Sequence, residues 1–270
     1  MARSSSSSAS RAEAGVADPG IEVTEGPLAD IVAEAERVLD SAEARGVPLR
    51  LIGGLAVQLH TPAMRPALAR SYGDIDTATV KGNSGAVTEL LTGLGYEPAR
   101  QFNALQGASR LLFHDRPNSR KLDVFVGGFE LNHSIPITAR IDVEPRTIPL
   151  AELLLTKLQV VEFTEKDVRD AVALLLEHEV ADGDRETINA DLIAALTARD
   201  WGLWRTSQLN LGRLREGVVT LALEPADQQL VLDRIDSLSR RIEREPKSRR
   251  WRLRARVGER KRWYEVPDEV

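Results

Sequence analysis

The sequence predicts a mixed α/β domain followed by a helical region. Over residues 27–148, short apolar runs typical of buried strands alternate with segments whose apolar residues recur at helical spacing. Beyond Pro149 the helical spacing continues with no strand-like run. We therefore expect an α/β (α+β) fold in which a mixed β-sheet flanked by helices fills residues 27–148. A helical domain with a basic C-terminal segment should fill residues 149–270.

The first elements are marked by glycines. A helix is expected over residues 27–45, with a proline in its first turn and Gly46 at its end. The apolar run Leu49 to Ile52 is typical of a buried strand by its length and flanks. Gly53 and Gly54 end that strand, and a second helix should follow them.

Four further strands and one helix are expected in the first domain. The stretch RSYGDIDTATV, residues 70–80, has the character of a strand in its second half, and residues 84–94 follow with helical spacing. Residues 110–114 and 121–126 are strand-like runs separated by turn residues, which indicates a hairpin. One more strand is expected over residues 138–143.

The second domain has four expected helices. Three of them cover residues 150–163, 166–178 and 184–198. The fourth carries Val231, Ile235, Leu238 and Ile242, spaced like the apolar seam of a coiled coil. The serine-rich residues 1–26 contain too few apolar residues to repay the entropy of ordering, so we expect a disordered tail there.

Composition excludes several classes of function. The 270 residues include 42% hydrophobic and 29% charged side chains and no cysteine, which rules out disulfides and thiolate metal sites. There is no run of about 18 apolar residues, so no helix should cross a membrane. The N-terminus lacks the apolar core of a secretory signal. These features favour a cytoplasmic protein.

Charge is spread unevenly along the chain. Residues 240–262 carry twelve basic and three acidic side chains, a local charge of +9 that leaves −14 for the rest of a chain whose net charge is −5. Arginines interspersed with Trp251, Trp263 and Tyr264 suit a surface that grips a phosphate backbone and stacks on bases. The alternatives are a solvated helix face and a basic surface that docks on the acidic remainder.

Two aspartates stand at the start of the strand in residues 70–80. Asp74 and Asp76 point to the same face, with roughly 6–7 Å between their Cα atoms. Carboxylates this close repel each other unless a cation lies between them. Mg²⁺ suits such a site, because it accepts few protein oxygens and keeps water and phosphate in its shell. The alternative is a solvated strand start in which the aspartates cap or turn the chain.

Asp123 is the candidate for a third carboxylate on a neighbouring strand, as phosphoryl-transfer sites with two metals require. It interrupts an apolar strand, where an unpaired charge is costly; the alternative is a salt bridge to Lys121 or Arg120. Gly53 and Gly54 open a helix whose free N–H groups suit a triphosphate, or they simply make a tight turn.

These segments carry a family resemblance. IGGLAVQLH, RSYGDID and KLDVFV together resemble the DNA polymerase β-like nucleotidyltransferase superfamily. The segment LLLTKLQVVEFTEKDVRDAVAL is similar to a helical motif of its AbiEii/MenT-like branch, which includes toxins of toxin–antitoxin systems. The resemblance covers about residues 27–178 and implies a nucleotidyltransferase fold.

The resemblance implies a role for each motif residue. Asp74 and Asp76 would hold Mg²⁺ and the triphosphate, and Asp123 would share the metal site and act as general base. Lys157 would neutralise phosphate charge. The remaining positions would be Gly53 and Gly54, which cradle the phosphates, and Asp167, which positions Lys157 or the acceptor. Arg70 is a further nucleotide-binding candidate, which either meets a phosphate or simply flanks the strand.

The expected activity is Mg²⁺-dependent transfer of a nucleoside monophosphate from an NTP, such as ATP, to an acceptor hydroxyl. The acceptor would be RNA, especially a tRNA end, or a small hydroxylated molecule, and a toxin would have an antitoxin partner. The alternative is a non-catalytic module of the same fold that binds RNA or a protein partner.

Overall fold

The computed structural model describes residues 26–266. The tail expected over residues 1–26 therefore lies, apart from Gly26, outside the described residues. The helices are α1 (Ile31–Ala44), α2 (Gly53–His60), α3 (Ser84–Gly93), α4 (Arg100–Gln106), α5 (Leu150–Leu158), α6 (Glu165–Glu177), α7 (Ala190–Arg199), α8 (Trp201–Val218), α9 (Pro225–Arg244) and α10 (Arg249–Val257). Within residues 26–266, none of them is both long enough and apolar enough to cross a bilayer.

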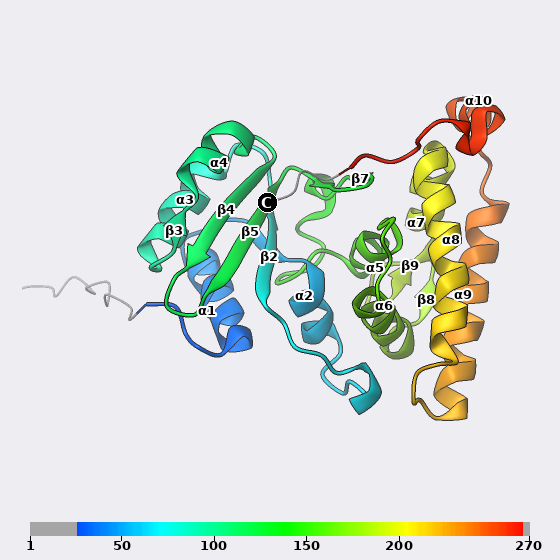
Figure 1. Cartoon of the computed structure of the whole chain (residues 1–270), viewed down its shortest axis with the longest axis horizontal. Coiled ribbons are helices and arrows are strands. Elements are labelled where there is room, and N and C mark those ends of the chain that lie inside the picture. The colour runs from blue at the N-terminus through cyan, green and yellow to red at the C-terminus, as the bar shows by residue number, and fades with distance from the viewer. Residues whose placement is uncertain (1–25, 267–270) are drawn as a thin grey trace, which may run out of the picture.

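A five-stranded mixed sheet forms the first half of the molecule, in the spatial order β1-β2-β5-β4-β3 (Figure 1). Its strands are β1 (Leu49–Leu51), β2 (Asp74–Thr79), β3 (Glu97–Pro98), β4 (Arg110–Asp115) and β5 (Arg120–Val126). The central pair β2–β5 is parallel, and the other neighbours are antiparallel. A parallel pair needs a long crossover, which α3, β3, α4 and β4 provide here. The mixed α/β fold predicted from the sequence is confirmed.

The second half is helical and is joined to the sheet through α2, which contacts β2 as well as α5 and α6. Figure 1 shows the sheet and the helical region on either side of α2. The predicted apolar seam of α9 is confirmed, because all four of its residues are fully buried where α9 packs on α7 and α8. Two small two-stranded sheets complete the fold: β6 (Phe129–Glu130) with β7 (Ser134–Ile135), and β8 (Val180–Ala181) with β9 (Ile188–Asn189).

Two sequence-based expectations need correction. Residues 138–143 do not form a strand: a 3₁₀ turn, η2 (Thr138–Arg140), begins there. Side-chain anchoring replaces strand pairing, since Arg140 donates to Glu152 at 2.6 Å and to Asp184 at 2.5 Å. The helix expected from residue 184 begins only at Ala190, because the preceding two residues pair with β8.

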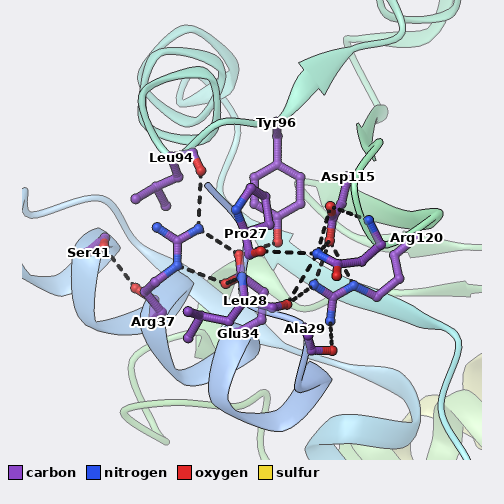
Figure 2. A network of polar contacts seen from close by, with 11 residues as sticks. Pro27, Leu28, Ala29, Glu34, Arg37, Ser41, Leu94, Tyr96, Asp115 and Arg120 are labelled. Atoms are coloured by element: carbon purple, nitrogen blue, oxygen red, sulfur yellow. Dashed lines mark hydrogen bonds and ion pairs between the residues drawn. The ribbon is translucent and has the colours of Figure 1, made fainter. Parts of the chain in front are cut away.

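A buried polar network fixes the start of the described chain to the β4–β5 hairpin (Figure 2). The Glu34 carboxylate accepts hydrogen bonds from Arg37, from the Tyr96 hydroxyl at 2.6 Å and from the Leu28 amide at 2.8 Å. Arg120 pairs with Asp115 and also reaches backbone carbonyls of residues 28 and 29. The network orients β5 and leaves Arg120 engaged away from Asp123.

Candidate active site

The register of the central strand pair brings the predicted aspartates together. In the parallel β2–β5 ladder, Asp76 is the direct partner of Asp123. Asp74 lies two residues before Asp76 and therefore projects from the same face. Asp74 is exposed, Asp76 is half-buried and Asp123 is buried. Three carboxylates thus share one patch at the middle of the sheet.

Their mutual repulsion affects the protonation of Asp76. Burial, followed by the negative charges of Asp74 and Asp123, raises the pKa of Asp76 to about 7. The positive charges of Lys157 and Arg110 act in the opposite direction. In the metal-free protein, Asp76 therefore holds a proton for about half of the time at neutral pH.

Asp123 is held by an arginine from the adjacent strand. Arg110 of β4 donates its Nε to Asp123 Oδ1 at 2.7 Å. The guanidinium group also lies over the Phe125 ring, 5.2 Å from its centroid. Asp123 thus forms a salt bridge, as the alternative interpretation expected, but the partner that the structure shows is Arg110. One carboxylate oxygen, Oδ1, is oriented by the arginine.

The glycine pair places the start of α2 against this patch. Gly53 has φ +68°, and a Cβ there would stand 2.5 Å from Asp76 Oδ2. A Cβ on Gly54 would stand 2.1 Å from the Arg70 guanidinium and 2.9 Å from the Tyr72 ring. Both positions therefore require glycine, since any side chain would push α2 away from Asp76 and Arg70. The first N–H groups of α2 open beside the carboxylates.

Lys157 and Arg70 both form ion pairs with Asp170 of α6. Arg70 donates two hydrogen bonds to the Asp170 carboxylate, at 2.8 and 2.7 Å, and Lys157 Nζ lies 2.8 Å from its Oδ2. Burial alone would raise the pKa of Asp170, but these two cations outweigh it and hold that pKa below its usual value. Arg70 also lies over the Tyr72 ring, 4.5 Å from its centroid.

Asp167 has a different position from the one expected. Its Oδ2 accepts hydrogen bonds from the Thr164 amide at 3.0 Å and the Thr164 hydroxyl at 2.7 Å, which closes a capping box at the start of α6. The structure therefore places Asp170, rather than Asp167, against Lys157. The two aspartates are almost one turn apart on α6, and Asp170 is the one on the buried side.

The donor set suits a hard divalent cation. No group of three or more His, Cys, Asp or Glu side chains among residues 26–266 stands in ready coordination geometry. The side-chain carboxylates of Asp74 and Asp76, however, form no hydrogen bond or ion pair within residues 26–266. Two carboxylates with open lone pairs fit Mg²⁺, which takes one or two protein carboxylates and completes its shell with water and phosphate oxygens.

Comparisons with known proteins find distant structural likeness alone. No protein-family model matches the chain, and no curated protein matches it. A solved structure of an antigenic nucleotidyltransferase-like protein from Paracoccidioides brasiliensis is 13% identical, covers 83% of this chain and 96% of its own, and has a TM-score of 0.38. The STING-associated CdnE c-di-GMP synthase from Capnocytophaga granulosa is 10% identical, with 78% and 79% covered and a TM-score of 0.22. Likeness at this level leaves the assignment of a function to the geometry of the site.

Two residues of the site were not selected from the sequence. Asp170 falls in the segment that carries Lys157, but acidic residues near a helix start are also common surface charges. Arg110 opens a strand thirteen positions before Asp123, and only the antiparallel β4–β5 register shows that they meet. Strand pairing is the signal that would have found Arg110.

Proposed function

We propose that the chain is a Mg²⁺-dependent nucleotidyltransferase that moves a nucleoside monophosphate from an NTP to an acceptor hydroxyl. One observation carries this proposal: the β2–β5 register sets Asp76 beside Asp123, with Asp74 on the same face and the glycine-opened start of α2 next to them. Three neighbouring carboxylates, one of them buried, repel each other unless a cation lies between them. The resemblance of the three motif segments supplies the reaction type.

The chain's own groups account for binding of the NTP. The free N–H groups at the start of α2 bind phosphate oxygens, and the absence of a Cβ at Gly53 lets those oxygens approach Asp76. Lys157 and Arg70, held together by Asp170, supply positive charge to the same phosphates. Asp74 and Asp76 would hold Mg²⁺, which would neutralise phosphate charge and favour ionisation of the acceptor hydroxyl.

Asp123 acts on the acceptor. Arg110 occupies Oδ1 of Asp123 and fixes the orientation of the carboxylate, so Oδ2 accepts the proton of the acceptor hydroxyl. The acceptor oxygen forms a bond to the α-phosphorus while the bond from that phosphorus to the β-phosphate oxygen breaks. Pyrophosphate leaves, and positioning and charge neutralisation provide most of the catalysis.

The proposal also covers the chemical class of the acceptor. RNA, and a tRNA end in particular, fits the basic segment at residues 240–262 and the toxin resemblance, which would also imply an antitoxin partner. A small hydroxylated molecule is the alternative acceptor. The second candidate function is a non-catalytic module of the same fold that binds RNA through the basic segment at residues 240–262, or binds a protein partner.

Label transfer tests the enzymatic proposal. The full chain is incubated with each α-labelled NTP, Mg²⁺ and total RNA, with EDTA as the metal-free arm. The wild type should label a macromolecular or small-molecule acceptor only in Mg²⁺, and Asp74→Asn or Asp76→Asn should abolish labelling. Asp182→Asn, an exposed loop aspartate, is the matched control. Full activity of Asp74→Asn or Asp76→Asn contradicts the proposal.

A further inference from the structure

A hollow of about 230 Å³ lies outside the carboxylate site, between the start of α8, helix α10 and the chain after η3 (Gly258–Arg260). We call it the aromatic hollow. Four aromatic side chains line it: Trp201, Trp251, Trp263 and Tyr264. The hollow is smaller than the roughly 300–1,000 Å³ of pockets for drug-sized ligands. It therefore suits a single planar ring system rather than a whole nucleotide.

The aromatic walls are held in place by one another. Trp263 stands edge-on to Trp201, with centroids 6.1 Å apart and planes at 80°, and edge-on to Tyr264 at 5.5 Å and 83°. The Trp263 indole also donates to the Thr206 hydroxyl at 3.0 Å. Rings fixed in this way offer a stacking surface that loses little entropy when a ligand binds.

The rim of the aromatic hollow carries a net positive charge. Arg254 is used structurally, because it lies over the Trp201 ring and donates to the carbonyl of Gly258 at 2.6 Å. By contrast, three exposed arginines have no hydrogen-bond or ion-pair partner for their side chains in the described part of the chain: Arg199, Arg250 and Arg262. Two acidic residues also line the hollow: Asp200, whose Oδ1 caps α8 by accepting from the Gly202 amide at 2.7 Å, and the exposed Glu265. The four lining arginines outnumber them. An anionic ligand would give these three guanidinium groups a partner of opposite charge; that of Arg262 lies over the Tyr264 ring, 5.9 Å from its centroid.

The chain after η3, which forms one wall of the hollow, is hydrogen-bonded to the domain that carries the carboxylates. Glu265 donates its amide to the Asn132 carbonyl at 3.0 Å, and Asn132 Nδ2 donates back to the Glu265 carbonyl at 2.8 Å. Asn132 lies in the β6–β7 turn, a few residues after β5. Figure 1 shows the chain beyond α10 running back from the helical region to this hairpin. The chain segment that lines the hollow after η3 is therefore held by α8 through Trp263 and by the β6–β7 turn through Glu265.

We propose that the aromatic hollow binds one unstacked nucleobase of a single-stranded nucleic acid, with the flanking phosphates on Arg199, Arg250 and Arg262. Aromatic faces together with a positively charged rim are the combination that single strands require, since every base has a face to stack and every phosphate a charge to neutralise. The binding itself is independent of catalysis. The further statement that the bound strand is the acceptor rests on the proposed nucleotidyltransferase function.

Binding is measured with the full chain, in EDTA and without NTP, so that catalysis plays no part. Fluorescein-labelled RNA and DNA eight-mers of the same sequence report binding by anisotropy, and the tryptophans of the hollow report it by quenching of their fluorescence. The single strand should bind at least tenfold more tightly than its duplex, whose bases are stacked and paired. The RNA and DNA arms show which sugar the site prefers.

Two variants test the phosphate contacts and the base stacking separately. The triple variant R199Q/R250Q/R262Q should lower affinity about tenfold or more and reduce the slope of log K against log salt by about 2. Tyr264→Leu should lower affinity roughly fivefold or more while leaving that slope unchanged. The control R45Q/R116Q/R185Q changes the net charge equally on exposed surface elsewhere and should bind within about twofold of wild type. Thermal melts of all variants separate misfolding from lost contacts.

Three results would overturn the proposal: no binding of the single strand, equal affinity for the duplex, or equal losses in the triple variant and its charge-matched control. Asp76→Asn separates this proposal from the enzymatic one. If that variant binds the eight-mer normally and the wild type transfers no label, the enzymatic proposal falls while the hollow stands. If label transfer is normal but the eight-mer does not bind, only the proposal that the aromatic hollow binds a nucleobase is refuted.

Discussion

Asp76 of β2 and Asp123 of β5 are direct partners across a parallel strand pair, although they are 47 positions apart in the chain. Burial, followed by the negative charges of Asp74 and Asp123, raises the pKa of Asp76 to about 7. A protein that keeps two carboxylates side by side at the centre of its main sheet stores electrostatic repulsion there. Binding of a divalent cation would release that repulsion, which makes the metal-free and metal-bound forms differ in measurable ways.

The pH dependence of Mg²⁺ binding follows from the raised pKa of Asp76. The cation competes with one proton, so affinity for Mg²⁺ should rise roughly tenfold between pH 6 and pH 8. Calorimetry in buffers of different ionisation enthalpy should show proton release at pH 6 and little at pH 8. Asp76→Asn should bind weakly at both, and a wild-type affinity that is flat across this range would refute the coupling.

Metal-free stability provides the matching test. Because the folded pKa of Asp76 exceeds its unfolded value, this residue's contribution is fully favourable below about pH 4 and is lost as pH rises through 7. At pH 8 in EDTA, Asp76→Asn should therefore unfold with a free energy up to about 4 kcal/mol greater than that of wild type. Urea melts at pH 4 and pH 8 measure the difference. A lower stability of Asp76→Asn at pH 8 would exclude stored repulsion.

Gly53 should tolerate no side chain. In Gly53→Ala the new Cβ would meet Asp76 Oδ2 at 2.5 Å in a backbone conformation with positive φ. We expect a loss of about 1–2 kcal/mol or more in the free energy of unfolding and weaker NTP binding. Gly85→Ala in α3 is the control, since its Cβ would meet nothing within 4 Å. That variant should be neutral or stabilised by up to about 1 kcal/mol.

Asp170 and Asp167 should respond differently to the same substitution. Asp170→Asn leaves the buried Lys157 and the half-buried Arg70 without a negative partner, which should cost about 3 kcal/mol or more and raise KM for the NTP. Asp167→Asn weakens only a helix cap and should cost about 1 kcal/mol with KM little changed. Chemical denaturation and initial rates measure both. A KM effect confined to Asp167→Asn would reverse the assignment.

His60 should make the fold sensitive to acid. Burial, followed by the charge of His178, lowers the pKa of His60 to about 4, and its Nε2 lies 2.6 Å from the Thr147 hydroxyl. The folded protein keeps His60 neutral while the unfolded chain protonates at about 6.5, so stability should fall by about 3 kcal/mol as pH drops from 6.5 to 4. His60→Gln should lose this part of the pH dependence and His114→Gln should retain it, as followed by urea melts.

Local sequence patterns were sufficient for the elements that build the site. The aspartates flanking Ile75 alternate with buried positions, so their common face could be read from the two-residue period of a strand. The glycine pair at the start of α2 marked a strand-to-helix turn in the same way. Both features depend only on residues close together in the sequence, so local sequence patterns are enough to predict them.

The contacts between distant segments could not be read in this way. The partners of Asp123 and Lys157 come from β4 and α6, and their identity depends on strand register and helix packing. The two-residue strands β6 to β9 are too short to show a period. Residues 138–143 had strand-like composition, yet Arg140 bonds to Glu152 and Asp184 instead of a strand partner. In each case a long-range interaction overrode the local preference.

The most direct test of the carboxylate site is calorimetric titration of the full chain with a non-hydrolysable NTP analogue, with and without Mg²⁺. The wild type should bind the analogue in Mg²⁺ and lose at least tenfold in affinity in EDTA, and Asp74→Asn and Asp76→Asn should bind equally weakly in both. Tight binding by the wild type that ignores Mg²⁺, or binding by Asp76→Asn that still depends on it, would contradict the assignment of these aspartates.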